Sequence, residues 1–204
     1  MNEKDKAIED LKIIRNIIDR TKEAIDPGAS ILILWGILVF IGNIITHFIL
    51  INKISSNYIG YTWWSIAITG FIISMFMGYK IGLRRYKYGF NHYISRQLAL
   101  VWTIIIPTGI VWTIIGPHFN IFTYESASVS VLWSMLYSIG IYTMGIFYSK
   151  EFLFGGIAIF LGTILSVIFI EIHCIIIGIF TGGGTTIPAI IAHRRFNKNL
   201  RKNK

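Results

Sequence analysis

Charged residues are scarce in this 204-residue chain, and that scarcity sets its class. Asp, Glu, Lys and Arg make up only 14% of the residues, whereas 54% are hydrophobic and the mean hydropathy is +0.63. A soluble core of this size cannot bury so much apolar surface. The few charges also gather in short stretches between long uncharged runs, which is the pattern of membrane-spanning segments. The sequence therefore predicts an all-α integral membrane protein.

Cysteine and the common catalytic motifs are also scarce or missing. Cys174 is the single cysteine, so the chain cannot form an intramolecular disulfide. The sequence contains no HExxH, GxSxG, GxGxxG or Walker motif. Catalysis inside a membrane needs specific groups held in a dry bundle, and the long uncharged runs contain no aspartate or glutamate. We therefore expect no enzymatic activity and no cofactor.

Six runs of 18 to 21 residues lack Asp, Glu, Lys and Arg altogether. At about 1.5 Å per residue, a helix of that length crosses a hydrocarbon layer of roughly 30 Å. A helix satisfies its backbone groups within its own segment, whereas a barrel needs shorter strands of alternating polarity. The predicted spans are 31–51, 61–79, 98–115, 129–147, 152–170 and 174–192, preceded by a cytoplasmic segment 1–27 and followed by a basic tail 193–204.

The positive charges predict the orientation of these spans. Eighteen of the nineteen Lys and Arg residues fall in the amino-terminal segment, the second and fourth connections and the tail, and the other side has only Lys53. Because cytoplasmic connections are rich in Lys and Arg, we expect a cell-membrane protein with both ends in the cytoplasm. The same residues favour anionic lipids or a protein partner. The candidate contact residues are Arg84, Arg85, Lys87, Arg194 and Arg195.

The connection 80–96 also interleaves basic residues with aromatic rings. This composition is typical of single-stranded nucleic-acid sites. A lipid headgroup layer attracts the same residue types, so the membrane location already explains them. We expect no nucleic-acid partner.

The segment before the first span has the pattern of an amphipathic helix. Its six bases and seven acids make it nearly neutral, unlike the cationic helices that anchor to lipid surfaces. Residues 7–25 either pack beneath the bundle or form a short coiled-coil site for a cytoplasmic partner or a second copy. The apolar stripe consists of Ala7, Leu11, Ile14, Ile18 and Ile25, and Pro27 and Gly28 end the helix.

The fifth and sixth predicted spans are joined by only three residues, Glu171, Ile172 and His173. They must therefore form an antiparallel hairpin. Small residues recur at every fourth position on both spans, which lets helix backbones approach closely in lipid. Counting equal distances from Ile172 pairs Ser166 with Gly178, Gly162 with Gly182, and Ala158 with Thr186.

The sixth predicted span contains the sequence GGGTTIP at 182–188. Such a stretch can unwind and present carbonyls and hydroxyls to an ion or solute, with Thr181, Thr185 and Thr186 lining the pathway. Glycine and proline are also common in ordinary membrane helices, where they allow close packing or a kink. We favour packing or a kink here.

Residues that bind metals or protons gather toward the outer ends of the spans. His47 shares a helix face with Asn43, four residues earlier, and Glu171 and His173 lie in the hairpin connection. These side chains could build a zinc or proton-relay site. The alternative is a set of interfacial residues hydrated by headgroup water. His47, Glu171 and His173 are the candidate metal ligands.

Two resemblances follow from these patterns. The amino-terminal quarter is similar to a family of small polytopic bacterial membrane proteins with no assigned activity. The overall layout resembles the membrane subunits of ABC-2-type exporters, and that resemblance implies that the connection 80–96 meets an ATPase. The residues that carry the first resemblance are Ile8, Leu11, Ile14, Arg15, Ile18, Arg20 and Thr21, followed by Leu34, Trp35, Gly36, Ile37 and Leu38.

The sequence favours a non-enzymatic accessory or regulatory membrane component that works through protein or lipid contacts. Its structured features lie on the predicted cytoplasmic side, whereas the spans hold almost no ionisable groups. The alternative is the membrane subunit of a transporter, or a permease for ions or small solutes.

Overall fold

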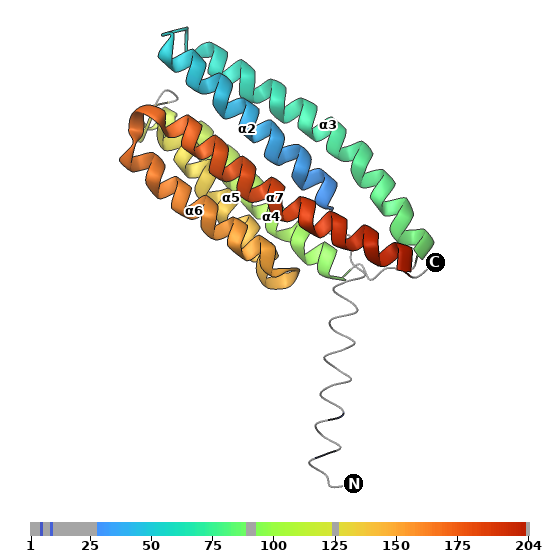
Figure 1. Ribbon diagram of the computed structural model, residues 1–204. Helices are drawn as coiled ribbons and strands as arrows, with labels where there is room; N and C mark the ends of the chain where they lie inside the picture. Colours follow the sequence, from blue (N-terminus) through green and yellow to red (C-terminus); the bar gives the residue numbers. More distant parts are fainter. Residues whose placement is uncertain (1–4, 6–8, 10–27, 89–92, 124–126, 203–204) are drawn as a thin grey trace.

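The computed structural model describes residues 5, 9, 28–88, 93–123 and 127–202. Within these residues are six helices long and apolar enough to cross a membrane, which confirms the predicted all-helical architecture (Figure 1). The predicted amphipathic helix before them lies outside the described residues, apart from Asp5 and Glu9. The elements are α2 (Ala29–Ile51), α3 (Asn57–Tyr88), α4 (Tyr93–His118), α5 (Ala127–Phe147), α6 (Lys150–Ile168), the short 3-10 turn η1 (Ile170–Ile172) and α7 (His173–Lys202).

Two helices extend far beyond their predicted spans. Helix α3 continues through Lys80 to Tyr88, and α7 continues to Lys202. Most of the predicted basic connection and nearly all of the predicted tail are therefore helical. Lys and Arg are good helix formers, and a helix needs no lipid to satisfy its own backbone. The uncharged run marks the part of a helix inside the hydrocarbon and not the end of the helix.

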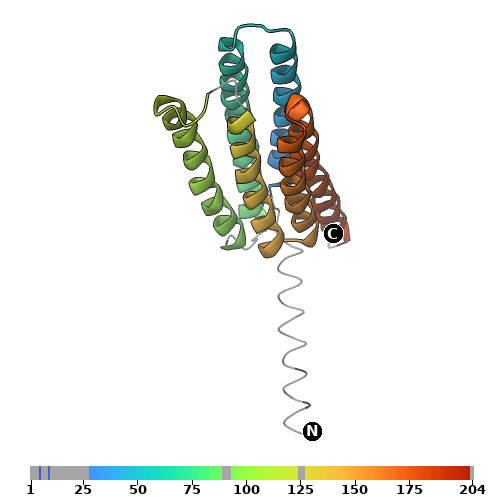
Figure 2. The ribbon, with the colours of Figure 1, turned by 90° about the vertical axis from the view of Figure 1, so that its left-hand side faces the viewer.

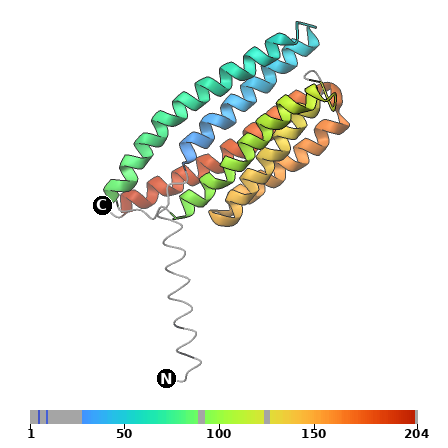
Figure 3. The same ribbon diagram turned by 180° about the vertical axis from the view of Figure 1, so that it is seen from behind.

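Helix α7 is the central element of the bundle. It packs against α2, α5 and α6, whereas α3 packs on α2 and α4 packs on α5 (Figures 1 and 2). Seen from behind, α4 lies beside α5 (Figure 3). The peripheral α3 exposes large apolar side chains such as Trp64, Phe71 and Phe76. Such a surface suits contact with lipid tails.

Tryptophan side chains attach the two peripheral helices to the bundle. The indole N–H of Trp35 on α2 donates to Ser74 Oγ on α3 at 3.0 Å. In the α4–α5 pair, the Trp133 indole donates to Thr113 Oγ1 at 2.9 Å. Each indole thus pairs its one polar group while its ring fills the contact between helices.

Glycines allow the closest helix contacts. A Cβ placed on Gly36 of α2 would lie 2.9 Å from the carbonyl oxygen of Gly182 on α7, and a Cβ on Gly182 would lie 2.9 Å from that of Gly36. On the other side of α7, a Cβ on Gly184 would lie 2.8 Å from the carbonyl oxygen of Gly155 on α6. Side chains at these positions would separate the backbones, so glycine sets the spacing around α7.

Candidate functional site

A buried cluster of hydroxyl groups joins three helices in the half of the bundle that contains the η1 turn. Ser134 of α5 lies 2.7 Å from Thr163 of α6 and 2.9 Å from Thr181 of α7, measured between hydroxyl oxygens. All three side chains are at most 2% exposed. In lipid, hydrogen bonds of this kind hold helices together.

The direction of these hydrogen bonds follows from counting protons. The Thr163 hydroxyl donates its one hydrogen to the carbonyl oxygen of Ile159, at 2.8 Å. Ser134 must therefore donate to Thr163, and Thr181 must donate to Ser134, because each hydroxyl has a single hydrogen. The result is a directed chain from α7 through α5 to α6.

The next hydroxyl along α7 has no such partner. Thr185 lies four residues after Thr181, hence on nearly the same face, and is fully buried. Among the described residues, its Oγ1 makes no hydrogen bond. Beside it, Pro188 has no N–H to donate to the carbonyl of Gly184, four residues earlier. Buried polar groups without partners are costly, so we expect the Thr185 hydroxyl to lower the stability of this turn of α7.

Asn43 on α2 is the second buried side chain with an unmatched polar atom. Its Nδ2 donates to the carbonyl oxygen of Val39 at 2.9 Å. Its Oδ1 has no hydrogen-bond partner within the described residues, and the side chain is only 2% exposed. Asn43 faces α7 near Gly178, where a Cβ would lie 3.0 Å from the Asn43 Cβ.

Helix α7 continues without interruption through the predicted Gly–Thr stretch. The three predicted pathway residues differ in their surroundings. Thr181 bonds to Ser134, Thr185 is buried without a partner, and the Thr186 hydroxyl lies over Gly36 of α2. Thr181 and Thr185 therefore share a face of α7, whereas Thr186 faces α2.

The small residues predicted at the α6–α7 contact occupy a different register. Gly162 faces the Phe180 side chain, whereas Gly178 and Gly182 face α2. Counting from Ile172 assumed a symmetric hairpin, but α6 ends at Ile168 and a 3-10 turn follows. Ala158 is half-buried on α6. The buried Ser166 hydroxyl donates to the Thr163 carbonyl within the same helix, at 2.7 Å.

The predicted metal ligands do not form a site. His173 Nδ1 lies 2.6 Å from the Ile170 carbonyl oxygen, and its Nε2 lies 3.2 Å from Cys174 Sγ. Glu171 is exposed, and His47 is half-buried on α2. In the part of the chain that the structure describes, no three His, Cys, Asp or Glu side chains could hold a metal ion together. The tight η1 turn directs His173 into the bundle and leaves Glu171 outside.

One end of the bundle is strongly basic, and we call it the basic end. It contains the carboxyl ends of α3 and α7 and the amino ends of α4 and α6 (Figure 2). At the opposite end, the described charged residues of the helices and turns are Lys53 and Glu171. The exposed cations of the basic end are Lys80, Arg96, Lys150, Arg194, Arg195 and Lys198.

Among the residues that the structure describes, one ion pair connects two helices at the basic end. Arg195 of α7 pairs with Glu151 of α6, and their side chains are 47% and 23% exposed. The predicted contact residues Arg194 and Arg195 are therefore both exposed, and one of them is engaged. The side chains of Arg84, Arg85 and Lys87 lie outside the described residues, although their backbone forms the last turns of α3.

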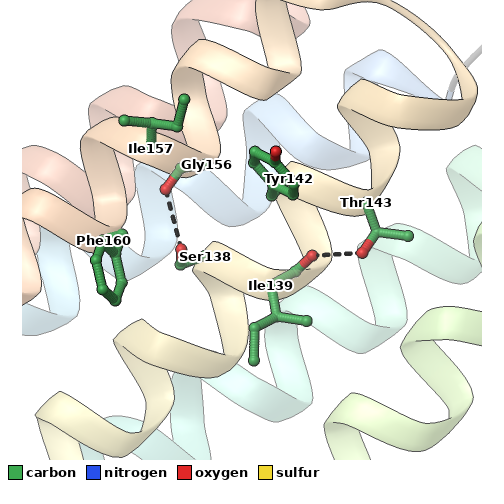
Figure 4. Close-up of a pocket in the computed structure, with 7 residues that line it drawn as sticks. All are labelled: Ser138, Ile139, Tyr142, Thr143, Gly156, Ile157 and Phe160. Atoms are coloured by element: carbon green, nitrogen blue, oxygen red, sulfur yellow. Dashed lines mark hydrogen bonds between the residues drawn. The ribbon is translucent and has the colours of Figure 1, made fainter.

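Two shallow grooves follow the seam between α5 and α6. The first, of about 270 Å³, lies in the half of the membrane nearer the basic end. The second, of about 380 Å³, lies toward the other end and is lined by the first turns of α5, by Val167 at the end of α6 and by Ile170 of η1. The residues that line the first are Ser138, Ile139, Tyr142, Thr143, Gly156, Ile157 and Phe160 (Figure 4).

Both the hydroxyl chain and the grooves were missed at the level of sequence. The sequence did contain a signal for the hydroxyl chain. Ser134 and Ser138 on α5 are four residues apart, and so are Thr181 and Thr185 on α7. Such spacing places each pair on one helix face. It does not show which faces meet.

In comparisons with known proteins, no protein-family model, no curated protein and no solved structure matches the chain.

Proposed function

We propose that this chain is a non-enzymatic accessory or regulatory component of the cell membrane, and that it acts through protein or lipid contacts at its basic end. The observation that carries the proposal is the charge asymmetry of the bundle. Six exposed cations gather at one end, whereas Lys53 is the one described cation of the other end. By the positive-inside rule, the basic end then faces the cytoplasm.

The basic end suits contact with an anionic surface. A Lys or Arg near an anionic membrane contributes about 1 kcal/mol of attraction. The Glu151–Arg195 ion pair joins α6 to α7 there. The neighbouring cations on these two helices are therefore held in place relative to one another. Residues 7–25 precede α2 in the sequence, and the amino end of α2 lies at the basic end. A partner bound to that segment would also meet the basic end.

The polar side chains inside the bundle support a role in holding the helices together. The hydroxyls of Ser134, Thr163 and Thr181 bond to one another across three helices. These groups connect helices, and their hydrogen-bonding capacity is directed inward.

Site-specific photocrosslinking tests this proposal. A photoreactive residue replaces Arg96 or Lys198 at the basic end, or Lys53 at the opposite end, and the full chain is irradiated in native membranes. We expect adducts with one recurring protein, or with anionic lipid, from Arg96 and Lys198 and not from Lys53. Deleting residues 1–26 should remove a protein adduct without preventing insertion. Equal adducts from both ends, or none from the basic end, would contradict the proposal.

A second candidate function is an ion or small-solute pathway, and one observation favours it. Thr185 Oγ1 and Asn43 Oδ1 are buried polar atoms without partners among the described residues, and such atoms can bind water or a cation. Single cysteines at Thr181, Thr185 and Thr186, in a Cys174→Ala background, test for water access. Reaction of Thr185→Cys with a small membrane-impermeant thiol reagent would support the pathway, and resistance at all three positions would remove its support.

A further inference from the structure

The groove nearer the basic end has apolar walls and a floor of backbone. Its walls are Ile139 and Tyr142 of α5 and Ile157 and Phe160 of α6, which are 42% to 57% exposed. In the floor, the Ser138 hydroxyl donates to the Gly156 carbonyl at 3.0 Å (Figure 4). The Ser138 hydroxyl and the Gly156 carbonyl are thus already paired, and the phenol hydroxyl of Tyr142 is the remaining polar group of the walls. A guest in this groove would meet mainly apolar surface, which suits a hydrocarbon chain.

Glycine makes the floor of the groove. A Cβ on Gly156 would lie 2.7 Å from the backbone nitrogen and Cα of Tyr142. The two helices can therefore approach closely, and the larger side chains on either side stand above the contact. The Thr143 hydroxyl donates to the Ile139 carbonyl of its own helix at 2.7 Å, so it also presents its methyl group rather than a free donor.

The depth of the groove matches one leaflet. Helix α6 begins at Lys150, and its groove residues lie six to ten positions further on. At about 1.5 Å per residue, they lie roughly 9 to 15 Å from the start of the helix. One leaflet contributes about 15 Å to a hydrocarbon layer of about 30 Å, so these residues lie within one leaflet. The groove therefore lies at acyl-chain depth in the leaflet next to the basic end.

Lys150 lies between the groove and the basic end, on the same side of α6 as the groove. Lys150 and Ile157 are seven residues apart, which is two helical turns and hence nearly the same face. The Lys150 side chain is exposed, and a lysine at a helix end extends its ammonium to the headgroup layer. The neighbouring carboxylate, Glu151, is engaged by Arg195. The net charge next to the groove, on the side nearer the basic end, is therefore positive.

We propose that this groove and Lys150 together bind one anionic phospholipid. An acyl chain lies between Tyr142 and Phe160, and the negatively charged headgroup contacts the Lys150 ammonium. This site rests on the lipid contacts of the proposed function and specifies one of them. A lipid held there would join α5 and α6 at the basic end, where the ion pair already joins α6 and α7.

Native mass spectrometry of the full chain tests the site. The protein is purified in detergent, exposed to equal amounts of phosphatidylglycerol and phosphatidylcholine with identical acyl chains, and the retained lipids are counted. We expect one retained phosphatidylglycerol. Lys150→Gln should weaken its retention about fivefold, the factor for the roughly 1 kcal/mol that one cation near an anionic surface contributes. Ile157→Trp, which fills the groove, should remove the retained lipid.

Two matched variants serve as controls. Lys80→Gln removes an exposed cation from α3, and Ile110→Trp enlarges a lipid-facing residue of α4 that is 45% exposed, as Ile157 is. Neither residue lines the groove, so both variants should retain the lipid. Thermal unfolding of each variant checks that the bundle is intact.

Three outcomes would overturn the site. Equal retention of phosphatidylcholine would show that no headgroup is selected. Unchanged retention in Lys150→Gln and Ile157→Trp would place the lipid elsewhere. A dimer that Ile157→Trp dissociates would show that a second copy occupies the groove. If the site fails while Arg96 and Lys198 still give their adducts, the proposed function stands without it. If the lipid is retained but Arg96 and Lys198 give no adducts, the lipid site stands and the proposed function fails.

Discussion

Gly36 of α2 and Gly182 of α7 face each other so closely that each carbonyl oxygen lies 2.9 Å from the point where a Cβ on the other residue would stand. These two carbonyl oxygens are backbone atoms, which cannot move aside as a flexible side chain can. The side chains of Thr186 and Phe40 add further obstacles at the same contact. This contact brings the first and last described helices together around the centre of the bundle.

Gly182→Ala should destabilise the bundle by about 1 to 3 kcal/mol, the usual cost of overpacking. Thermal or denaturant unfolding in detergent measures the effect. Gly78→Ala on α3 is the control, because a Cβ there meets nothing within 4 Å. That control should be neutral or stabilising by up to about 1 kcal/mol through helix propensity. Equal effects of the two substitutions would argue against the α2–α7 contact.

Ser134→Ala should destabilise the bundle by about 1 to 2 kcal/mol, because it removes two hydrogen bonds between helices. Combined with Thr181→Val in a double-mutant cycle, it should give a coupling energy of roughly 0.6 kcal/mol, the average for such pairs in membranes. The control is Thr62→Val, whose hydroxyl bonds only to the Tyr58 carbonyl of its own helix. Strictly additive effects of Ser134→Ala and Thr181→Val would mean that the two hydroxyls do not interact.

Thr185→Val should behave differently from Thr181→Val. The Thr185 hydroxyl is buried without a partner, so replacing it with a methyl group of similar size removes a desolvation cost. The substitution should be neutral or stabilising, whereas Thr181→Val should cost about 1 kcal/mol. The same unfolding measurement compares them. A clear loss of stability in Thr185→Val would reveal a bound water or ion on that hydroxyl and would favour the pathway.

Glu151→Gln should weaken the attachment of α6 to α7 at the basic end only slightly. Arg195 is 47% exposed, and exposed ion pairs contribute about 0.2 to 1 kcal/mol. Charge reversal is the sharper measurement, since Glu151→Arg alone should destabilise and Arg195→Glu added to it should restore stability. Absence of any restoration would mean that the pair does not form.

The number of spans could be predicted from sequence, because the length of an uncharged run is set by bilayer thickness. The ends of the helices could not. Lys80 ends the uncharged run of α3, yet the helix continues to Tyr88, since basic residues beyond the hydrocarbon still favour helix.

The contacts between helices could not be predicted from the spacing of small and polar residues in the sequence. Gly182 was predicted to face α6 and faces α2 instead. Its spacing shows that a close contact exists, but the neighbour depends on how α7 is rotated. The hydroxyl chain joins Ser134 to residues 29 and 47 positions away, so it exists only once three helices have assembled. The metal prediction grouped Glu171 with His173 because they are close in sequence. In the structure, the η1 turn leaves the Glu171 side chain exposed and buries that of His173.

The orientation of the basic end tests the account most directly, and cysteine labelling in intact cells measures it. In a Cys174→Ala background, Lys53→Cys and Lys198→Cys are treated with a membrane-impermeant thiol reagent. The account predicts that Lys53→Cys reacts from outside, and that Lys198→Cys reacts only after the membrane is opened. Labelling of Lys198→Cys in intact cells, with Lys53→Cys protected, would contradict a cytoplasmic basic end and the function proposed for it.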